Sequence, residues 1–542
     1  MSQFGAKKAK NTDEVRAERA KPTPVLWGLG CAIATIGVVV IGVSNPAYAL
    51  PSFARQTGQP CGACHTDFPG LTPFGRQFKL GGYTLGGGDY PLTPFESSAG
   101  PEAKALSSYA RKMNDKSAGM PTKAPPLGTP PAAGTPADIG YNGWMPPIAV
   151  MGIFQFTHQN ADRDPADVEP WNTNDNVKLN QASVFYGGAV TEHTGAFVQW
   201  TYEPNIGAPD HQDPYGGKEW HWDNVDLRAA NAGQIGGVDV TYGLTATNNP
   251  SMADPWNTTP VWGFPYTDAG DIATSPAAAT MLDGGSWGQQ VGGVGGYAWF
   301  DNLVYVQLSG FGTLDPGILD VVGITPFDAP GKINGVAPYW RVAVEPHWGN
   351  NWWEFGTFGM TASFSPYTCA VDNTTCALDS AGMYTTETSA QSNRYTDVGF
   401  DSQYQYQGDN YWITARATFI HENQSFDLMT GTSANTSNTL NNLKLYGSFA
   451  YGNDNRIVFS GQYFDTWGSS DATEYGTANG SPNTNGVTLE LSYIPFILSK
   501  APVWPWANAR VGAQYTIYNE FDGTNAGASD NNTFNLYLWL AG

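Results

Sequence analysis

The sequence predicts an all-β protein: a transmembrane antiparallel β-barrel of about sixteen strands that follows a small N-terminal segment. Three observations support this prediction. Beyond the N-terminal region, segments of about ten residues alternate apolar and polar side chains, and Gly/Asn/Asp-rich breaks separate them. Aromatic residues make up 13% of the chain and charged residues only 14%. No uninterrupted apolar run after residue 43 is long enough for a transmembrane helix.

The alternation is regular in several segments, and it places polar groups on one face only. Between Val487 and Tyr493, for example, every second residue is apolar and the residues between them are polar. A soluble β-sandwich would alternate in the same way, with its polar face in water. Aromatic pairs at segment ends and ionisable residues on the polar face favour a barrel with a polar lumen. Those ionisable residues are Arg228, Arg341, Glu345, Arg416, Glu490 and Arg510.

Sixteen segments fit the strand pattern, although counts of fourteen or eighteen remain open. An even number places both ends of the barrel on the periplasmic side. The stretches 204–221, 248–293, 312–337 and 365–395 are expected to be loops. The predicted strands are 148–157, 181–190, 195–203, 222–231, 238–247, 294–301, 303–311, 338–347, 352–364, 396–406, 410–421, 443–451, 456–465, 487–495, 506–518 and 533–541.

The first 49 residues have the pattern of a secretory signal peptide. A basic region is followed by an apolar run, Val25 to Val43, and then by Ala47-Tyr48-Ala49, a cleavage signal of the A-x-A type. An uncleaved anchor helix is the alternative, because 19 apolar residues nearly span a bilayer. Cleavage near Ala49 would leave 20 basic and 45 acidic residues, a net charge of −25. Such acidity disfavours nucleic acid as a partner and favours cations.

The segment Cys61-Gly-Ala-Cys64-His65 has the C-x-x-C-H spacing at which c-type haem is attached. Two thiols at this spacing can each form a thioether with one porphyrin edge, and the adjacent His65 can bind the iron as proximal ligand. Zinc binding or thiol redox chemistry is the alternative use of such a pair. No second CxxC follows, and no thioredoxin-like βαβ pattern surrounds it. We therefore expect one covalent haem c in a small N-terminal c-type cytochrome segment.

Segment 50–79 is a basic island in an acidic chain. Its basic residues are Arg55, Arg76 and Lys79, against one acid, Asp67. Because haem carries two propionates and arginine binds carboxylates with two hydrogen bonds, Arg55 and Arg76 are candidate haem-binding residues. Ordinary surface or lumen-wall ion pairing is an equally good explanation of these cations.

Two further pairs of residues are candidates for a site. Met113 and Met120 follow His65 at a distance from which a thioether could return as the sixth iron ligand, although a lone methionine usually serves packing. Cys369 and Cys376 enclose six residues of a polar loop. In an exported chain, a local disulfide between them is expected.

Two stretches around the haem motif carry a family resemblance. Pro51-Ser52-Phe53-Ala54-Arg55-Gln56-Thr57-Gly58 precedes it, and Leu71-Thr72-Pro73-Phe74-Gly75-Arg76-Gln77-Phe78-Lys79 follows it. Over residues 51–85 the chain resembles the fused monohaem cytochrome–porin family of the bacterial outer membrane, whose best-known members are Fe(II) oxidases. The stretch from Asn248-Asn249-Pro250 to Thr259-Pro260 also looks similar to this family. Elsewhere in the barrel the similarity is architectural only.

The resemblance implies an electron conduit in the outer membrane. Electrons from an extracellular donor, with Fe(II) as the leading candidate, would pass through the haem to a periplasmic carrier such as a soluble cytochrome or a copper protein. This would make the chain an Fe(II):cytochrome-type oxidoreductase. The implied organisation is a signal peptide (1–49), a monohaem segment (50–100), a Pro/Gly-rich linker with a short helix (101–145) and the barrel (146–542).

Two other functions remain open at this point. One is a solute-conducting porin with a structural or accessory haem, and the other is a periplasmic haem carrier with a β-sandwich domain. Two acidic clusters could attract Fe²⁺, although solvated loop charge is the favoured explanation of both. They are Asp162/Asp164/Asp167/Glu169 and Asp210/His211/Asp213.

Overall fold

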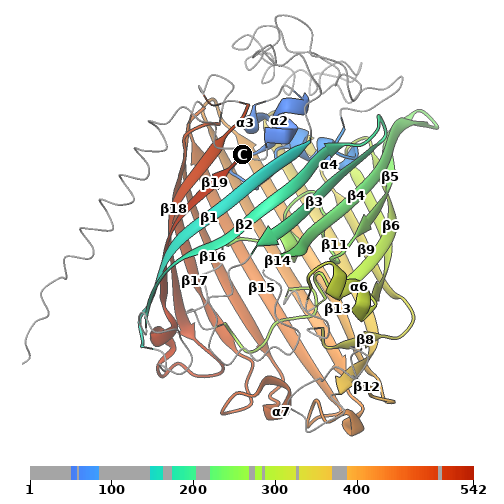
Figure 1. Cartoon of the computed structure of the whole chain (residues 1–542), viewed down its shortest axis with the longest axis vertical. Coiled ribbons are helices and arrows are strands. Elements are labelled where there is room, and N and C mark those ends of the chain that lie inside the picture. The colour runs from blue at the N-terminus through green and yellow to red at the C-terminus, as the bar shows by residue number, and fades with distance from the viewer. Residues whose placement is uncertain are drawn as a thin grey trace, which may run out of the picture. The chain divides into compact units, whose positions relative to one another are not determined.

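The strands of the chain close into one antiparallel barrel (Figure 1). The computed structural model describes residues 51–57, 60–84, 147–162, 174–202, 220–267, 275–283, 287–324, 329–368, 387–453, 455–497, 503 and 505–542. Of nineteen strands in the sheet, β8, β10 and β12 have only two or three residues. The other sixteen form the wall, and β1 pairs with β19 to close it. The prediction of sixteen wall strands is therefore confirmed.

Every predicted segment is a strand, and many strands are longer than expected. Strand β4 runs from 220 to 235 against a prediction of 222–231, because the strand continues past the membrane-spanning pattern. The strands are β1 Ile148–Gln159, β2 Asp175–Ala189, β3 Thr194–Tyr202, β4 Trp220–Ile235, β5 Val238–Thr247, β6 Val291–Phe300, β7 Val304–Thr313, β8 Gly331–Ile333, β9 Ala337–Val344, β10 His347–Trp348, β11 Asn351–Thr368, β12 Glu387–Thr388, β13 Asn393–Gln407, β14 Tyr411–Ser425, β15 Ser437–Tyr451, β16 Arg456–Gly468, β17 Thr484–Ile494, β18 Asn508–Glu520 and β19 Thr533–Ala541.

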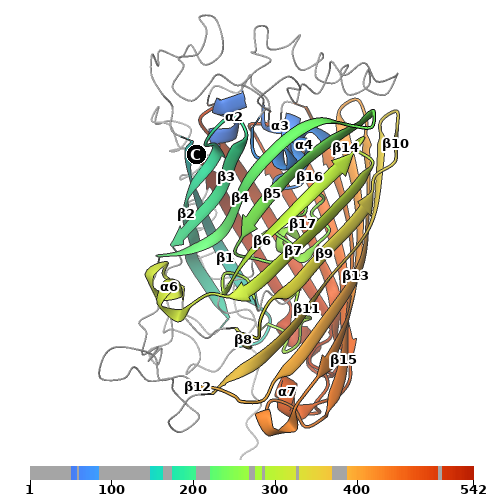
Figure 2. The same cartoon turned by 90° about the vertical axis from the view of Figure 1, so that its right-hand side faces the viewer.

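The barrel is apolar outside and polar inside. On β17, Leu491 is 56% exposed while its neighbour Glu490 is 2% exposed. All six ionisable residues predicted to face the lumen are likewise buried. A soluble sandwich would show the reverse, whereas a closed sheet with an apolar exterior satisfies every backbone group within lipid. The chain is therefore an outer-membrane barrel, and its strands tilt against the barrel axis (Figures 1 and 2).

The connections define the two ends of the barrel. Those at one end, such as 236–237 and 408–410, are mostly short, while those at the other end, such as 248–290 and 426–436, are mostly long. Short turns are typical of the periplasmic side. The C-terminus and helices α2 and α3 lie at this end, whereas α7 lies at the opposite end (Figure 1).

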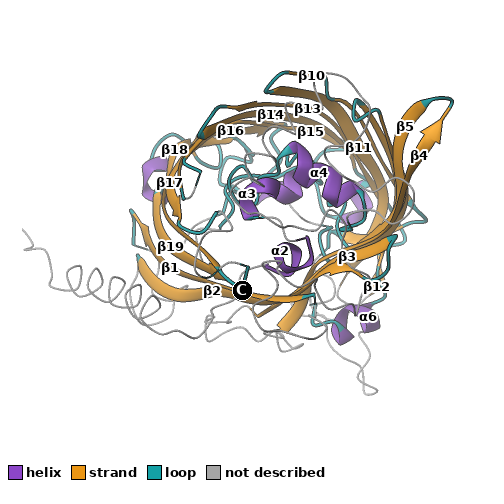
Figure 3. Ribbon diagram, turned by 90° about the horizontal axis from the view of Figure 1, so that it is seen from above, coloured by secondary structure: helices purple, strands orange, loops and turns teal. Residues whose placement is uncertain are grey.

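Three helices lie within the ring of strands: α2 (Pro51–Thr57), α3 (Cys61–Cys64) and α4 (Pro73–Leu80) (Figure 3). Helix α4 begins where the Thr72 hydroxyl accepts a hydrogen bond from Gly75 N, at 3.1 Å. Gly75 has no substitute here, because a Cβ would lie 2.3 Å from Cys64 O. The remaining helices are α6 (Pro316–Val321), α7 (Ala472–Tyr475) and the 3₁₀ turns η1 (Pro260–Trp262), η2 (Leu428–Thr430) and η3 (Ala528–Asn531). No helix in the described part of the chain is long and apolar enough to cross a bilayer.

Candidate functional site

The C-x-x-C-H motif forms one helical turn whose thiols share a face. Cys61 and Cys64 begin and end α3, and a spacing of three residues places their side chains on the same side of a helix. His65 leaves the helix in an extended conformation, and its backbone N–H donates to Cys61 O at 2.9 Å. Its ring Nδ1 lies 3.3 Å from the carbonyl oxygens of both Pro69 and Gly70. Nδ1 is thus turned to the backbone, and Nε2 is the atom available to a metal.

The motif lines a cavity inside the lumen. This cavity, which we call the motif cavity, has a volume of about 350 Å³ and is bounded by Cys61, Cys64 and His65. That volume falls within the roughly 300–1,000 Å³ of cofactor sites. Its walls are mostly apolar and come from both the helical segment and the barrel. They include Phe53, Phe68, Phe78, Met151, Ile153, Phe185, Phe197, Trp262 and Trp539. Two thiols and an imidazole at the edge of an apolar cavity fit the covalent haem that the motif predicts.

Burial determines the protonation of the motif. Desolvation lowers the pKa of His65 to about 4, against the opposing effect of its two carbonyl hydrogen bonds. The imidazole is therefore neutral, as a metal ligand requires. Desolvation raises the pKa of the Cys64 thiol to about 12, which disfavours the thiolate chemistry of redox CxxC pairs. In the described ranges, no three His, Cys, Asp or Glu side chains gather into a protein-only metal site.

Arginines of the barrel wall hold the loop that carries His65. Arg456, at the start of β16, donates through Nη1 to His65 O at 2.6 Å and also to Thr66 O. Arg510 of β18 donates to Phe68 O, and its Nη2 lies 2.5 Å from Glu490 Oε1. Because the ring nitrogen of His65 is oriented by carbonyls of the same loop, these wall contacts fix the direction of the imidazole.

A stretch of the long β5–β6 connection crosses the lumen. This inner loop, residues 248–267, contacts the inner face of three strands: Asp254 pairs with Arg341 of β9, Thr258 O accepts from Thr418 of β14, and Phe264 O accepts from Gln462 of β16. It also contributes Trp262 to the motif cavity. The lumen is therefore occupied by both the helical segment and the inner loop.

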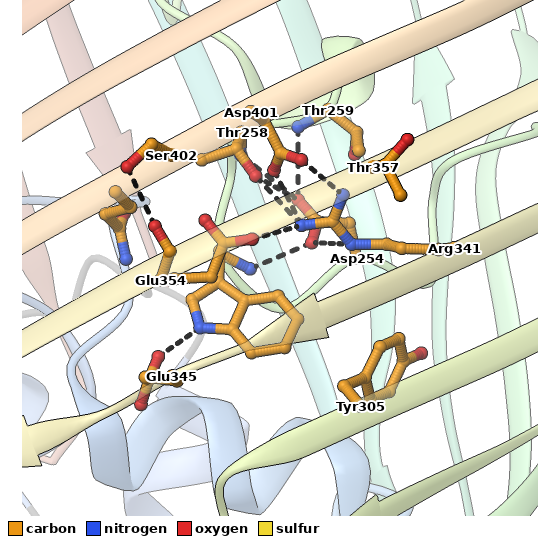
Figure 4. A network of polar contacts seen from close by, with 12 residues as sticks. Asp254, Thr258, Thr259, Tyr305, Arg341, Glu345, Glu354, Thr357, Asp401 and Ser402 are labelled. Carbon is orange, nitrogen blue, oxygen red and sulfur yellow. Dashed lines mark hydrogen bonds and ion pairs between the residues drawn. The ribbon is translucent and has the colours of Figure 1, made fainter.

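The inner loop is fastened by a buried ion network (Figure 4). Arg341 is completely buried and pairs with three carboxylates: Asp401 at 2.7 Å, Asp254 at 3.1 Å and Glu354 at 3.2 Å. Burial disfavours ionisation of Asp254, but Arg341 and Lys79 overcome this effect and lower its pKa. A second contact joins the Trp256 indole N–H of the same loop to Glu345 of the wall.

The structure separates the three cations of the helical segment. The fully buried Arg76 lies 2.9 Å from Glu345 and 2.6 Å from Gln405, and it does not line the motif cavity. Arg55 donates to Ile148 O at 2.5 Å, lies over the Trp506 ring, and is also away from the cavity wall. Lys79 does line it. The contacts of Arg76 are those of a lumen-wall ion pair, the alternative that the sequence left open.

Several predicted features lie outside the described residues. These are the signal peptide, the linker 101–145, Met113 and Met120, the Cys369–Cys376 pair, and the acidic clusters apart from Asp162. Their predictions stand as expectations.

Three groups at the site were not recognised from the sequence. The sequence places Arg510 on a lumen face but does not indicate that it holds the loop that carries His65. Arg456 has no sequence signal beyond its position at a strand start. The inner loop was assigned only as a loop. Its one signal was the family-like stretch from Asn248 to Pro260, which here supplies Asp254 and Trp256.

The fold has distant counterparts among solved structures. The outer membrane channel DcaP of Acinetobacter baumannii is 11% identical, covering 73% of this chain and 96% of that one, with a TM-score of 0.39. OmpF of Salmonella typhi in complex with daunomycin is 12% identical, covering 73% of this chain and 97% of that one, with a TM-score of 0.37. OmpT of Vibrio cholerae is 10% identical, covering 73% of this chain and 96% of that one, with a TM-score of 0.36. No family model and no curated protein matches the chain. Likeness at this level says nothing about what this chain binds or carries.

Proposed function

We propose that this chain is an outer-membrane electron conduit of the fused cytochrome–porin type. One haem c on Cys61 and Cys64, with His65 as proximal ligand, would take electrons from an extracellular donor, with Fe(II) as the leading candidate, and pass them to a periplasmic carrier. The observation that carries the proposal is the placement of a C-x-x-C-H turn on an apolar cavity inside a membrane-spanning barrel. When bound, the haem supplies a one-electron redox centre.

The protein residues have three tasks in this proposal. Cys61 and Cys64 anchor the cofactor, while the carbonyls of Pro69 and Gly70 orient the His65 ring. The mostly apolar walls of the cavity would limit contact between the haem and water. The barrel wall carries the whole assembly across the bilayer, which a soluble cytochrome could not cross.

The filled lumen favours electrons over solutes. Aromatic side chains of the helical segment, Phe74, Phe78 and Tyr83, share one apolar cluster with Phe185 and Phe197 of the wall. The inner loop adds the ion network around Arg341. Packing of this kind in the described part of the lumen favours transfer of electrons through a bound redox centre over passage of a hydrophilic solute.

The periplasmic placement of the motif supports delivery to a soluble carrier. Gly62 N donates to Ile497 O in the short-turn end of the barrel, at 2.9 Å. Oxidation at the opposite end would give one electron per Fe(II) and leave insoluble Fe(III) outside the cell. The acidic chain, with a formal net charge of −22, would attract Fe²⁺ over about a Debye length of ~8 Å.

The test uses the full-length barrel in liposomes. We expect covalent haem in the wild type and none in the C61A/C64A variant, measured by acid–acetone-resistant haem, with equal heat-modifiable mobility of both barrels. Added Fe(II) should then reduce the wild-type haem. Haem that stays oxidised with Fe(II) across pH 3–7 would exclude iron and leave another donor to be sought.

The alternative is a solute-conducting porin with an accessory haem, which the barrel architecture favours. Swelling of the same liposomes in sugar solutions distinguishes the two. Swelling comparable to that of an open porin would favour the alternative.

A further inference from the structure

We infer that Lys79 is the counter-ion of a haem carboxylate in the motif cavity, and that the same ammonium group fastens the inner loop to the helical segment. This inference rests on the haem of the proposed function. It assigns to Lys79 a role that the basic island of the sequence could equally have given to Arg55 or Arg76.

Lys79 lies at the junction of three parts of the site. It stands in the last turn of α4, is only 6% exposed, and lines the motif cavity. Its Nζ donates to the backbone oxygens of Met252 and Asp254 in the inner loop, both at 2.8 Å. The ring of Trp262 lies 5.1 Å from Nζ, and the indole N–H of Trp262 donates to Met252 O at 3.2 Å. One ammonium group thus joins α4, the inner loop and the cavity wall.

The positive charge of Lys79 has no anion in contact within the described structure. Carbonyl oxygens accept its hydrogen bonds but carry no net charge. The two acids whose charge acts on Lys79 lie closer to other cations: Asp226 is 2.8 Å from Arg228, and Asp254 is 3.1 Å from Arg341, which it shares with two further carboxylates. Burial lowers the pKa of Lys79 to about 7, and the positive charge of Arg228 adds to this effect against the attraction of the two acids. A buried ammonium of this kind is costly without an anion, and it retains a third N–H to offer one.

The other cations fit this role less well. Arg510 also lines the cavity, but it lies 2.5 Å from Glu490 and donates to Phe68 O, so its charge is already balanced. Arg76 pairs with Glu345 away from the cavity. Haem brings two carboxylates into walls that are otherwise mostly apolar, and a carboxylate there needs a cation. Among the described cations that line the cavity, Lys79 is the one with no carboxylate at ion-pair distance.

The pairing would favour the reduced haem. A positive charge beside the cofactor stabilises the form that has gained an electron, so its removal should make reduction harder. One unit charge at roughly 12 Å changes such an equilibrium about tenfold at an effective dielectric constant of about 20. The fastening of the inner loop is a separate effect, because it involves hydrogen bonds rather than net charge.

The experiment compares full-length barrels in detergent, each first tested for covalent haem. Haem reduction is then titrated at fixed pH against a redox dye. We expect Lys79→Met to lower the reduction equilibrium constant about tenfold and Lys79→Arg to restore most of it. Arg55→Gln removes one charge from the same segment away from the cavity and should change it less than twofold.

The outcomes separate this inference from the function on which it rests. A wild type without covalent haem would overturn the proposed function itself. Haem-loaded Lys79→Met that titrates like wild type would overturn the role of Lys79 and leave the function intact. If Lys79→Met attaches no haem, Lys79→Gln takes its place, with the same expectation.

Discussion

Arg341 forms the largest ion network that holds the inner loop, so Arg341→Gln should weaken docking of the loop against the barrel wall. The variant leaves Asp254, Glu354 and Asp401 buried without their shared partner. Removing one member of a buried ion pair costs about 3–5 kcal/mol. At about 1.4 kcal/mol per factor of ten, the ratio of docked to undocked loop falls at most roughly 100- to 5,000-fold, because Glu354 and Asp401 belong to the wall and lose their partner in both states.

The barrel itself should survive this change, because β9 pairs with β7 and β11 through main-chain hydrogen bonds. We expect unchanged heat-modifiable mobility but an increased single-channel conductance in planar bilayers. Arg394→Gln is the matched control, since Arg394 is an exposed arginine of β13. Arg341→Lys should be intermediate, because lysine cannot form the forked hydrogen bonds of a guanidinium. Conductance of Arg341→Gln equal to that of wild type would refute the reasoning.

Three further predictions follow from local features. Gly75→Ala should lower the yield of covalent haem, because the added Cβ would clash with the backbone of α3 at a cost of about 1–3 kcal/mol. Gly447→Ala is the control: its Cβ would meet nothing within 4 Å, and the haem yield should not change. Burial raises the pKa of Glu474 to about 7, so its protonated form stabilises α7. This stabilisation should be complete below about pH 4.5, the ordinary pKa of the group, and should be lost as the pH rises through 7. Hydrogen exchange of residues 471–480 should show this change, and Glu474→Gln should abolish it. Cys369 and Cys376 should resist maleimide before reduction, and loss of their bond should cost at most ~2–3 kcal/mol; two readily labelled thiols would exclude it.

Most of the barrel could be predicted because its signal is local. Side chains of a strand alternate with a period of two, so the apolar exterior and polar lumen appear in the order of residues alone. Strand bounds were less accurate. The β11 strand continues to Thr368 because two short strands pair with it beyond the predicted end at 364: β12 with Tyr367 and Thr368, and β8 with Ser365 and Pro366. That pairing joins segments about thirty residues apart and leaves no periodic mark.

The candidate site also has features that the sequence predicts and features that only the structure shows. The spacing of Cys61, Cys64 and His65 predicts haem attachment from five residues alone. One helical turn suffices to place both thiols on one face. The sequence also predicts the sign of the charges that face the lumen. What it could not rank were the cations of the basic island, which differ only in what surrounds them after folding.

The amino-acid sequence by itself therefore predicted the barrel class, a count of about sixteen strands and the expected cofactor motif, because each depends on neighbours along the chain. Only the tertiary structure decided that the helical segment lies within the lumen, that the inner loop crosses it, and that Lys79 rather than Arg76 lines the motif cavity. The physical reason is the distance in sequence between the partners. His65 O is held by Arg456, 391 residues away, and such a contact exists only once the barrel has closed.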